Sequence, residues 1–168
     1  MVDRVMRTAR RDILLHAAWV LYILSLASYA LSFLLPAFEI VVEGQHDTSY
    51  GYDAFLVALA AAWQPILGGL LSFVVWLANP AYWAGAVFFA RGRYWRSAAA
   101  SIAALVLGCH FVFAPLILVG YFVWLGSMAL LAVASAVSLV RERQARTAEP
   151  VAADVTMNVK PRLGDDGR

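Results

Sequence analysis

The amino-acid sequence predicts an all-α membrane protein, a bundle of four transmembrane helices, and three observations support this fold class. Of the 168 residues, 62% are hydrophobic and 14% are charged, whereas a soluble domain is about a quarter charged and just under half apolar. Apolar runs long enough to cross a bilayer recur along the chain, and the basic residues lie between them. This pattern excludes a soluble globular domain, a disordered chain and a nucleic-acid-binding protein.

The 13 Lys and Arg residues define the expected orientation, because they form clusters at residues 4–11, 91–96 and 141–168. Positive residues that flank spans stay on the cytoplasmic side. We therefore expect both termini to be cytoplasmic in a multi-pass protein of the plasma (inner) membrane of a bacterium. The connector 36–53 has acidic residues and no basic one, which predicts the outer face. The arginines can also contact anionic lipid headgroups, each for about 1 kcal/mol.

The first predicted span covers residues 13–35. It follows the first basic cluster, and it exceeds the roughly 7–15 apolar residues of a cleaved signal, so we expect a retained signal anchor. A spanning helix needs about 20 residues. Pro36 ends this span, because proline cannot continue the helical hydrogen-bond ladder.

Residues 54–90 are too long for one span and too short for two. They begin outside and end inside at Arg91, so the number of crossings is odd and one span, 68–90, is predicted. The excess predicts a short outer helix over residues 52–63, either interfacial or re-entrant, with Asp53 capping its start. Aromatic rings typical of the headgroup level belong to Tyr50, Tyr52 and Trp63.

Residues 97–140 have no Asp, Glu, Lys or Arg and are flanked by basic residues on both sides. The chain must therefore leave and return, which predicts a third span over 97–114 and a fourth over 119–140. The turn is expected between Pro115 and Gly120. Two rings near the start of the fourth span are expected to be interfacial anchors: Tyr121 and Trp124.

The polar segment 141–168 has no apolar periodicity, which predicts a disordered cytoplasmic tail beyond a short extension of the fourth helix. Inside the membrane, close packing and buried polar contacts drive helix association. Small residues at four-residue spacing therefore favour one compact bundle, and the main pairs are Ser28/Ser32, Ser97/Ser101, Ala99/Ala103, Ala100/Ala104, Ala132/Ala136 and Ala134/Ser138. The single cysteine, Cys109, cannot form an intramolecular disulfide and is expected to be buried.

The Asn79-Pro80 pair interrupts the second span. Pro80 lacks a donor and frees the carbonyl of Trp76, and such a break is tolerated only where another group satisfies that carbonyl. Asn79 is the expected local partner, or it bonds to a neighbouring helix. A structural kink is the simpler interpretation, and a binding cavity at the membrane midplane, as in transporters with broken helices, is the functional one.

An ionisable residue within a span is a functional hypothesis by default, and here that residue is His110. The alternative is a neutral histidine bonded to a backbone carbonyl or to Asn79. A weak divalent-cation site or a proton relay towards His110 could form in the outer loop, although a solvated acidic loop is the simpler interpretation of its residues Glu39, Glu43, His46, Asp47 and Asp53. No catalytic, nucleotide-binding or metal-binding spacing occurs, so we expect no enzymatic activity, cofactor or metal.

Four segments resemble those of a group of uncharacterised small bacterial polytopic membrane proteins: Ser-Leu at 25–26, Leu-Leu-Pro-Ala-Phe at 34–38, Gly-Tyr-Asp-Ala-Phe-Leu at 51–56 and Trp-Leu-Ala-Asn-Pro at 76–80. The likeness extends over the chain to about residue 90 and is most specific at Asn-Pro. It implies a first span that ends in Leu-Pro-Ala-Phe, an outer helix, and a second span that Trp-Leu-Ala-Asn-Pro opens. It implies no activity.

Two function hypotheses follow. The first is a non-enzymatic accessory or interaction protein, for instance of the immunity type, that binds a membrane-protein partner or a second copy through residues 36–65. The alternative is a small-molecule or lipid transporter or binder with a midplane site near Asn79, Pro80 and His110. A polar cavity near Asn79 and His110 would favour the second hypothesis, and a dry bundle with an exposed outer-helix patch would favour the first.

Overall fold

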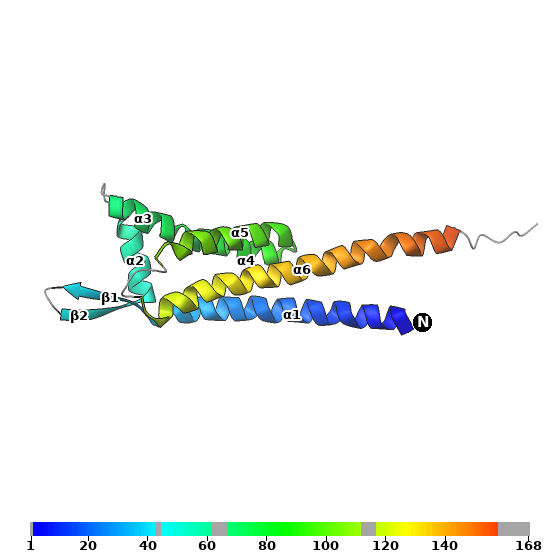
Figure 1. The fold of residues 1–168 in the computed structure, drawn as a ribbon, viewed down its shortest axis with the longest axis horizontal. Coiled ribbons are helices and arrows are strands. Elements are labelled where there is room, and N and C mark those ends of the chain that lie inside the picture. The colour runs from blue at the N-terminus through cyan, green and yellow to red at the C-terminus, as the bar shows by residue number, and fades with distance from the viewer. Residues whose placement is uncertain (1, 43–44, 62–66, 112–116, 158–168) are drawn as a thin grey trace, which may run out of the picture.

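The computed structural model describes the backbone of residues 2–42, 45–61, 67–111 and 117–157. Figure 1 shows long helices side by side, with a strand hairpin and two short helices at one end of the molecule. The elements in chain order are α1 (Val2–Ser32), β1 (Pro36–Val42), β2 (Gln45–Tyr50), α2 (Gly51–Ala61), α3 (Leu67–Trp76), α4 (Ala78–Ala90), α5 (Tyr94–Gly108), the 3-10 helix η1 (Cys109–Phe111) and α6 (Val119–Met157).

Within the described ranges, three helical segments are long and apolar enough to cross a membrane: Asp12–Ser32, Ser72–Ala90 and Val119–Arg146. They correspond to the first, second and fourth spans that the sequence predicts. The predicted third span, 97–114, falls on α5, which has 15 residues and therefore extends about 22 Å. The hydrocarbon core is about 30 Å thick, so α5 by itself is shorter than a full crossing. Residues 112–114 lie outside the described part.

The expectation of an all-α chain is wrong for the connector between α1 and α2, whose strands β1 and β2 form an antiparallel hairpin. The strands pair from Val42 opposite Gln45 to Pro36 opposite Tyr50, with an irregularity between Pro36 and Phe38. Phe38 also forms a bridge to Ile117. The hairpin is thereby attached to the segment that precedes α6.

Two predicted boundaries differ from the structure. The predicted outer helix 52–63 is α2, which starts at Gly51, so Asp53 lies in its first turn and does not cap it. A carboxylate there still interacts favourably with the positive end of the helix dipole. The predicted disordered tail is helical as far as Met157, because α6 continues through residues 141–157.

Polar side chains connect the long helices inside the bundle. The Ser25 hydroxyl donates to the carbonyl of Ser127 at 2.7 Å, so the Tyr82 hydroxyl must donate to Ser25 at 2.9 Å. This arrangement joins α1, α4 and α6. The Ser97 and Ser135 hydroxyls lie 2.7 Å apart and join α5 to α6. Such bonds hold helices together where lipid removes the hydrophobic driving force between them.

Small residues form the buried face of α5, as the sequence predicts in part. Ser97, Ser101, Ala104 and Gly108 are buried on this helix, and Ala134 and Ser138 are buried on α6. Other predicted members of these faces are exposed: Ala99, Ala103 and Ala136. Spacing therefore identified small-residue stripes, but it did not identify which stripe faces the neighbouring helix.

Candidate functional site

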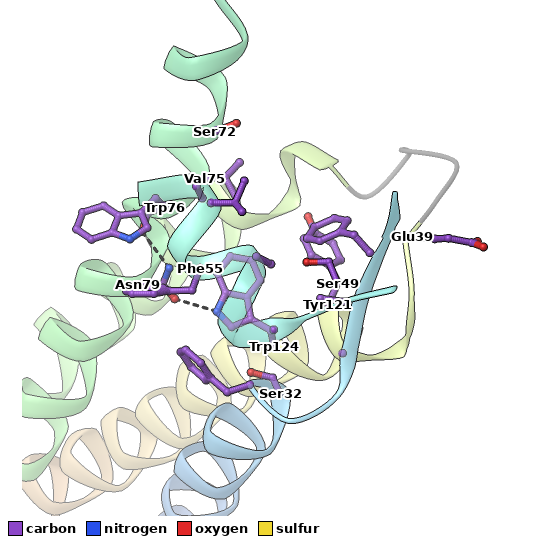
Figure 2. A pocket seen from close by; sticks show the side chains of 18 residues that line it. Ser32, Glu39, Ser49, Phe55, Ser72, Val75, Trp76, Asn79, Tyr121 and Trp124 are labelled. Atoms are coloured by element: carbon purple, nitrogen blue, oxygen red, sulfur yellow. Dashed lines mark hydrogen bonds between the residues drawn. The ribbon is translucent and has the colours of Figure 1, made fainter. Parts of the chain in front are cut away.

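A cavity of about 410 Å³ lies where the hairpin, α2 and the α3–α4 break meet the end of α1 and the start of α6. Figure 2 shows the side chains that these elements contribute, with Glu39 pointing away from the rest. The volume is within the roughly 300–1,000 Å³ of small-molecule sites. Most of the lining is apolar or aromatic, and its largest side chains are Phe33, Phe38, Phe55, Trp76, Tyr121 and Trp124.

Asn79 is the polar centre of this site and is 8% exposed. Its Oδ1 accepts hydrogen bonds from the Tyr29 hydroxyl at 2.8 Å and from Nε1 of Trp124 at 3.0 Å. Because an indole nitrogen only donates, the bond to Trp124 fixes which end of the amide is the oxygen. Figure 2 shows the amide between Trp76 and Trp124. Asn79 therefore links α4 to both α1 and α6.

The break in the second span has the local repair that the sequence predicts. The helix is interrupted at Leu77, and Nδ2 of Asn79 donates to the carbonyl of Trp76 at 3.1 Å. This is the carbonyl that Pro80 deprives of its helical donor. Both expected roles of Asn79, local repair and a bond to a neighbouring helix, occur together.

Aromatic side chains that contact one another line the α2–α3 side of the cavity. The ring centroids of Phe33 and Phe55 are 5.8 Å apart, and those of Phe55 and Trp76 are 6.0 Å apart. Phe73 stacks on Trp76 at 6.0 Å. Nε1 of Trp76 is buried and has no hydrogen-bond partner among the described residues. A buried donor without an acceptor is unfavourable, and because this nitrogen has almost no accessible surface, it does not face the open space of the cavity.

The charged side chain of the described lining is Glu39, on β1. Its Oε1 lies 2.6 Å from Nδ1 of His46, whose side chain is 64% exposed. Nearby on α2, the pKa of Tyr52 is raised from its ordinary value, chiefly by the negative charge of Asp53. The charged side chain of the lining thus belongs to the hairpin, and the α3 residues of the lining, Ser72, Val75 and Trp76, have no charge.

The structure separates the other predicted site residues from Asn79. Pro80 is exposed in the first turn of α4, and His110 is exposed in η1 and does not line the cavity. The expected contact between Asn79 and His110 is therefore not formed, because α5 ends at Gly108 and the following turn faces away. Cys109 is also exposed, which corrects the expectation that it is buried.

The acidic outer residues do not converge on one point. Asp47 is exposed on β2 and Asp53 is partly buried on α2, whereas Glu43 lies outside the described residues. Among the described side chains, no group of three or more His, Cys, Asp or Glu residues could hold a metal ion. Of the predicted set, the structure brings Asn79 and Glu39 to the same cavity, with His46 bonded to Glu39.

Tyr29, Tyr121 and Trp124 contribute to the site in ways that the sequence prediction missed. Tyr121 and Trp124 were expected as interfacial anchors; in the structure the Tyr121 hydroxyl donates to the carbonyl of Gly108 and Trp124 bonds to Asn79. The available signal was that a ring with a polar group finds a hydrogen-bond partner when it is buried.

A search of family models, curated proteins and solved structures finds no significant match to this chain.

Proposed function

We propose that the chain is a non-enzymatic, multi-pass plasma-membrane protein that binds an amphipathic small molecule or lipid in the cavity beside Asn79. The observation that carries this proposal is the cavity itself, which combines an apolar lining with few polar groups. Small-molecule sites have this composition, because the apolar lining supplies affinity and the few polar groups orient the ligand. The proposal keeps Asn79 from the sequence-based hypothesis of a binder and leaves out His110, which does not line the cavity.

The proposed topology has four crossings and cytoplasmic termini. In its support, the start of α1 and the far end of α6 lie at the same end of the molecule, and the hairpin lies at the other (Figure 1). Exposed Arg91, Arg93 and Arg96 surround the α4–α5 connection, as expected of a cytoplasmic connector. We infer that α5 is the remaining crossing, because it packs between α4 and α6 and an even number of crossings places both termini on one side.

Cysteine labelling tests the topology. Asp47 on β2 and Arg93 in the α4–α5 connection are both exposed, so each accepts a cysteine, whereas the positive φ of Gly92 disfavours one. Cys109 is exposed too and must first be replaced by alanine. We expect a membrane-impermeant maleimide to label Asp47→Cys in intact cells and Arg93→Cys only after permeabilisation. The reverse pattern would contradict the proposed orientation.

Filling the cavity tests the binding function. Ala58 lines the cavity, and Ala60 on the same helix is exposed and does not line it. Each becomes phenylalanine at the same cost in helix propensity. We expect native mass spectrometry of the protein from mild detergent to detect one retained small molecule in the wild type and in Ala60→Phe, but much less in Ala58→Phe. Equal retention in all three proteins, or none in any, would contradict the proposal.

The accessory-protein hypothesis stays as a second candidate, because α2 has an exposed apolar surface. The exposed fraction is 58% for Leu56 and 60% for Val57. An interaction protein would present such a surface to a membrane-protein partner or a second copy. This candidate gains support if a partner co-purifies with the wild type and with Ala58→Phe but is lost from Leu56→Ser. It loses support if Leu56→Ser retains the partner.

A further inference from the structure

We propose that the turn between α4 and α5 binds the phosphate group of an anionic phospholipid through the side chains of Arg91, Arg93 and Arg96. The inference goes beyond the proposed function, because the turn lies at the end of α4 away from the cavity. It is carried by the level of the turn along a candidate span, by arginines that have no carboxylate partner, and by an exposed tryptophan in the same turn.

The turn lies at the level of lipid headgroups. The candidate span that contains α4, Ser72–Ala90, has 19 residues, so as a helix it extends about 28 Å. The hydrocarbon core is about 30 Å thick, and Arg91 directly follows the span. Figure 1 shows α4 and α5 joined at the end away from α3. A span that crosses the core therefore places this turn among the phosphates of one membrane surface, whichever way the protein is oriented.

The arginines of the turn have positive charge that the protein itself does not neutralise. Arg91, Arg93 and Arg96 are exposed, and among the described residues none of them forms a salt bridge with a carboxylate. The sequence has no Asp or Glu in residues 54–141. A guanidinium group matches a phosphate through two parallel hydrogen bonds. The turn is therefore complementary to an anionic headgroup, which is the anion that a membrane surface supplies.

Two features restrict the motion of these arginines before a lipid binds. Three hydrogen bonds fix the backbone of the turn, and the N–H groups of Arg91, Gly92 and Arg93 donate them to carbonyls in the last turn of α4. Gly92 permits this geometry with a φ of 69°, which glycine adopts without a Cβ clash. The guanidinium carbon of Arg96 lies 5.5 Å from the ring centroid of Trp95, a cation–π contact. A preorganised site loses less conformational entropy on binding.

Trp95 indicates a lipid, and not a soluble anion, as the partner. The residue is 63% exposed and lies in the first turn of α5. Exposed tryptophan rings are typical of the headgroup level, because the ring is amphipathic. Net charge then selects the headgroup: phosphatidylglycerol is anionic, whereas the ammonium group of phosphatidylethanolamine is repelled by arginine. Phosphatidylglycerol is therefore the probe, and phosphatidylethanolamine of equal chain length is the comparison.

The experiment measures lipid retention by the full-length protein in detergent micelles that contain the two lipids in equal amounts, with native mass spectrometry as the readout. We expect the wild type to retain phosphatidylglycerol in preference. Each arginine near the surface contributes a factor of about five, so Arg93→Gln should lower the ratio of phosphatidylglycerol to phosphatidylethanolamine about fivefold. The triple variant Arg91→Gln/Arg93→Gln/Arg96→Gln should lose the preference.

A second triple variant with the same net charge is the matched control. Arg10→Gln/Arg141→Gln/Arg146→Gln also removes three positive charges, but from α1 and α6, and should keep the preference of the wild type. Equal losses in the two triple variants would show a general attraction of anionic lipid to a basic protein and would overturn the site. Inorganic phosphate at matched ionic strength should not displace phosphatidylglycerol, and displacement would overturn the assignment to a lipid.

The outcomes also separate this inference from the proposed function. Ala58 lines the cavity, so Ala58→Phe should keep the lipid ratio of the wild type, and each proposal can fail while the other stands. Equal retention of the two lipids by the wild type overturns the inference without any variant. If the triple variant of the turn fails to fold, Arg93→Gln decides, because it changes one exposed side chain; an unchanged ratio in that variant overturns the inference.

Discussion

Replacing Asn79 by leucine removes the polar centre of the site while nearly preserving its size. The substitution deletes the two bonds that Oδ1 accepts from Tyr29 and Trp124 and the one that Nδ2 donates to Trp76. The three partner groups stay in place without an amide to bond. Because Asn79 is 8% exposed, water has little access to replace it. The expected result is a less stable bundle.

The magnitude follows from the number of bonds. Hydrogen bonds between membrane helices contribute about 0.6 kcal/mol on average and up to about 1.7 kcal/mol. Three such bonds give a loss of about 2–5 kcal/mol in the free energy of unfolding. Tyr29→Phe and Trp124→Phe each remove one donor and should each lose about 0.6–1.7 kcal/mol. Asn79→Leu is therefore expected to exceed either single-donor variant.

Reversible unfolding by sodium dodecyl sulfate in mixed micelles measures these changes, with helical circular dichroism as the signal. In the double variant with Asn79→Leu, Tyr29→Phe has no bond left to remove, so the combined loss should fall short of the sum by about 0.6–1.7 kcal/mol. An Asn79→Leu protein within about 0.5 kcal/mol of the wild type, or strict additivity with Tyr29→Phe, would refute the three-bond description.

Four further substitutions, one of them a control, test other contacts. Gly51→Ala places a Cβ against a backbone oxygen at the end of α1 and should cost about 1–3 kcal/mol of unfolding free energy; Gly126→Ala on α6, where a Cβ meets no atom, should be neutral or stabilising. Ser97→Ala breaks the α5–α6 hydroxyl bond and should lower the free energy of unfolding by about 0.6–1.7 kcal/mol in the same titration. An unchanged midpoint would show that this bond does not contribute to stability. Glu39→Gln loses only the exposed contact with His46, so its thermal midpoint should correspond to a change below about 1 kcal/mol.

The kink at Asn79 could be predicted from sequence because its cause is local. Pro80 cannot donate, the carbonyl it deprives lies four residues earlier on Trp76, and an amide next to the proline reaches that carbonyl. The chain supplies all three groups within five consecutive residues. No knowledge of the neighbouring helices was needed.

The sequence prediction missed the hairpin because it gave the acidic residues of this segment more weight than the β-branched ones. Ile40, Val41 and Val42 are β-branched residues, which favour strands. The Glu43-Gly44 pair next to them in the sequence is typical of a turn. The acidic residues of the same segment indicated only an outer loop. The attachment of the hairpin through Phe38 and Ile117 joins residues far apart in sequence, so composition could not reveal it.

The position of His110 depends on where α5 ends and on how it is rotated. The buried face of α5 runs through Ser101, Ala104 and Gly108. Cys109 and His110 follow in a 3-10 turn and are both exposed. A one-residue offset is about 100° around a helix, so predicting the span alone could not decide whether His110 faced the bundle. The orientation of the small-residue face decided it.

Asn79 forms more hydrogen bonds than the repair of a proline kink requires, and the additional bonds support a binding site. Repair of the proline break needs one donor for the carbonyl of Trp76, which Nδ2 provides. Oδ1 additionally holds Tyr29 and Trp124, so rings from α1 and α6 are fixed beside the same opening in the helix. The amide thus satisfies the backbone of Trp76 and leaves the indole N–H of the same residue unsatisfied among the described groups. Repair of the break alone does not require the bond to Trp124, which fixes the position of a residue that lines the cavity.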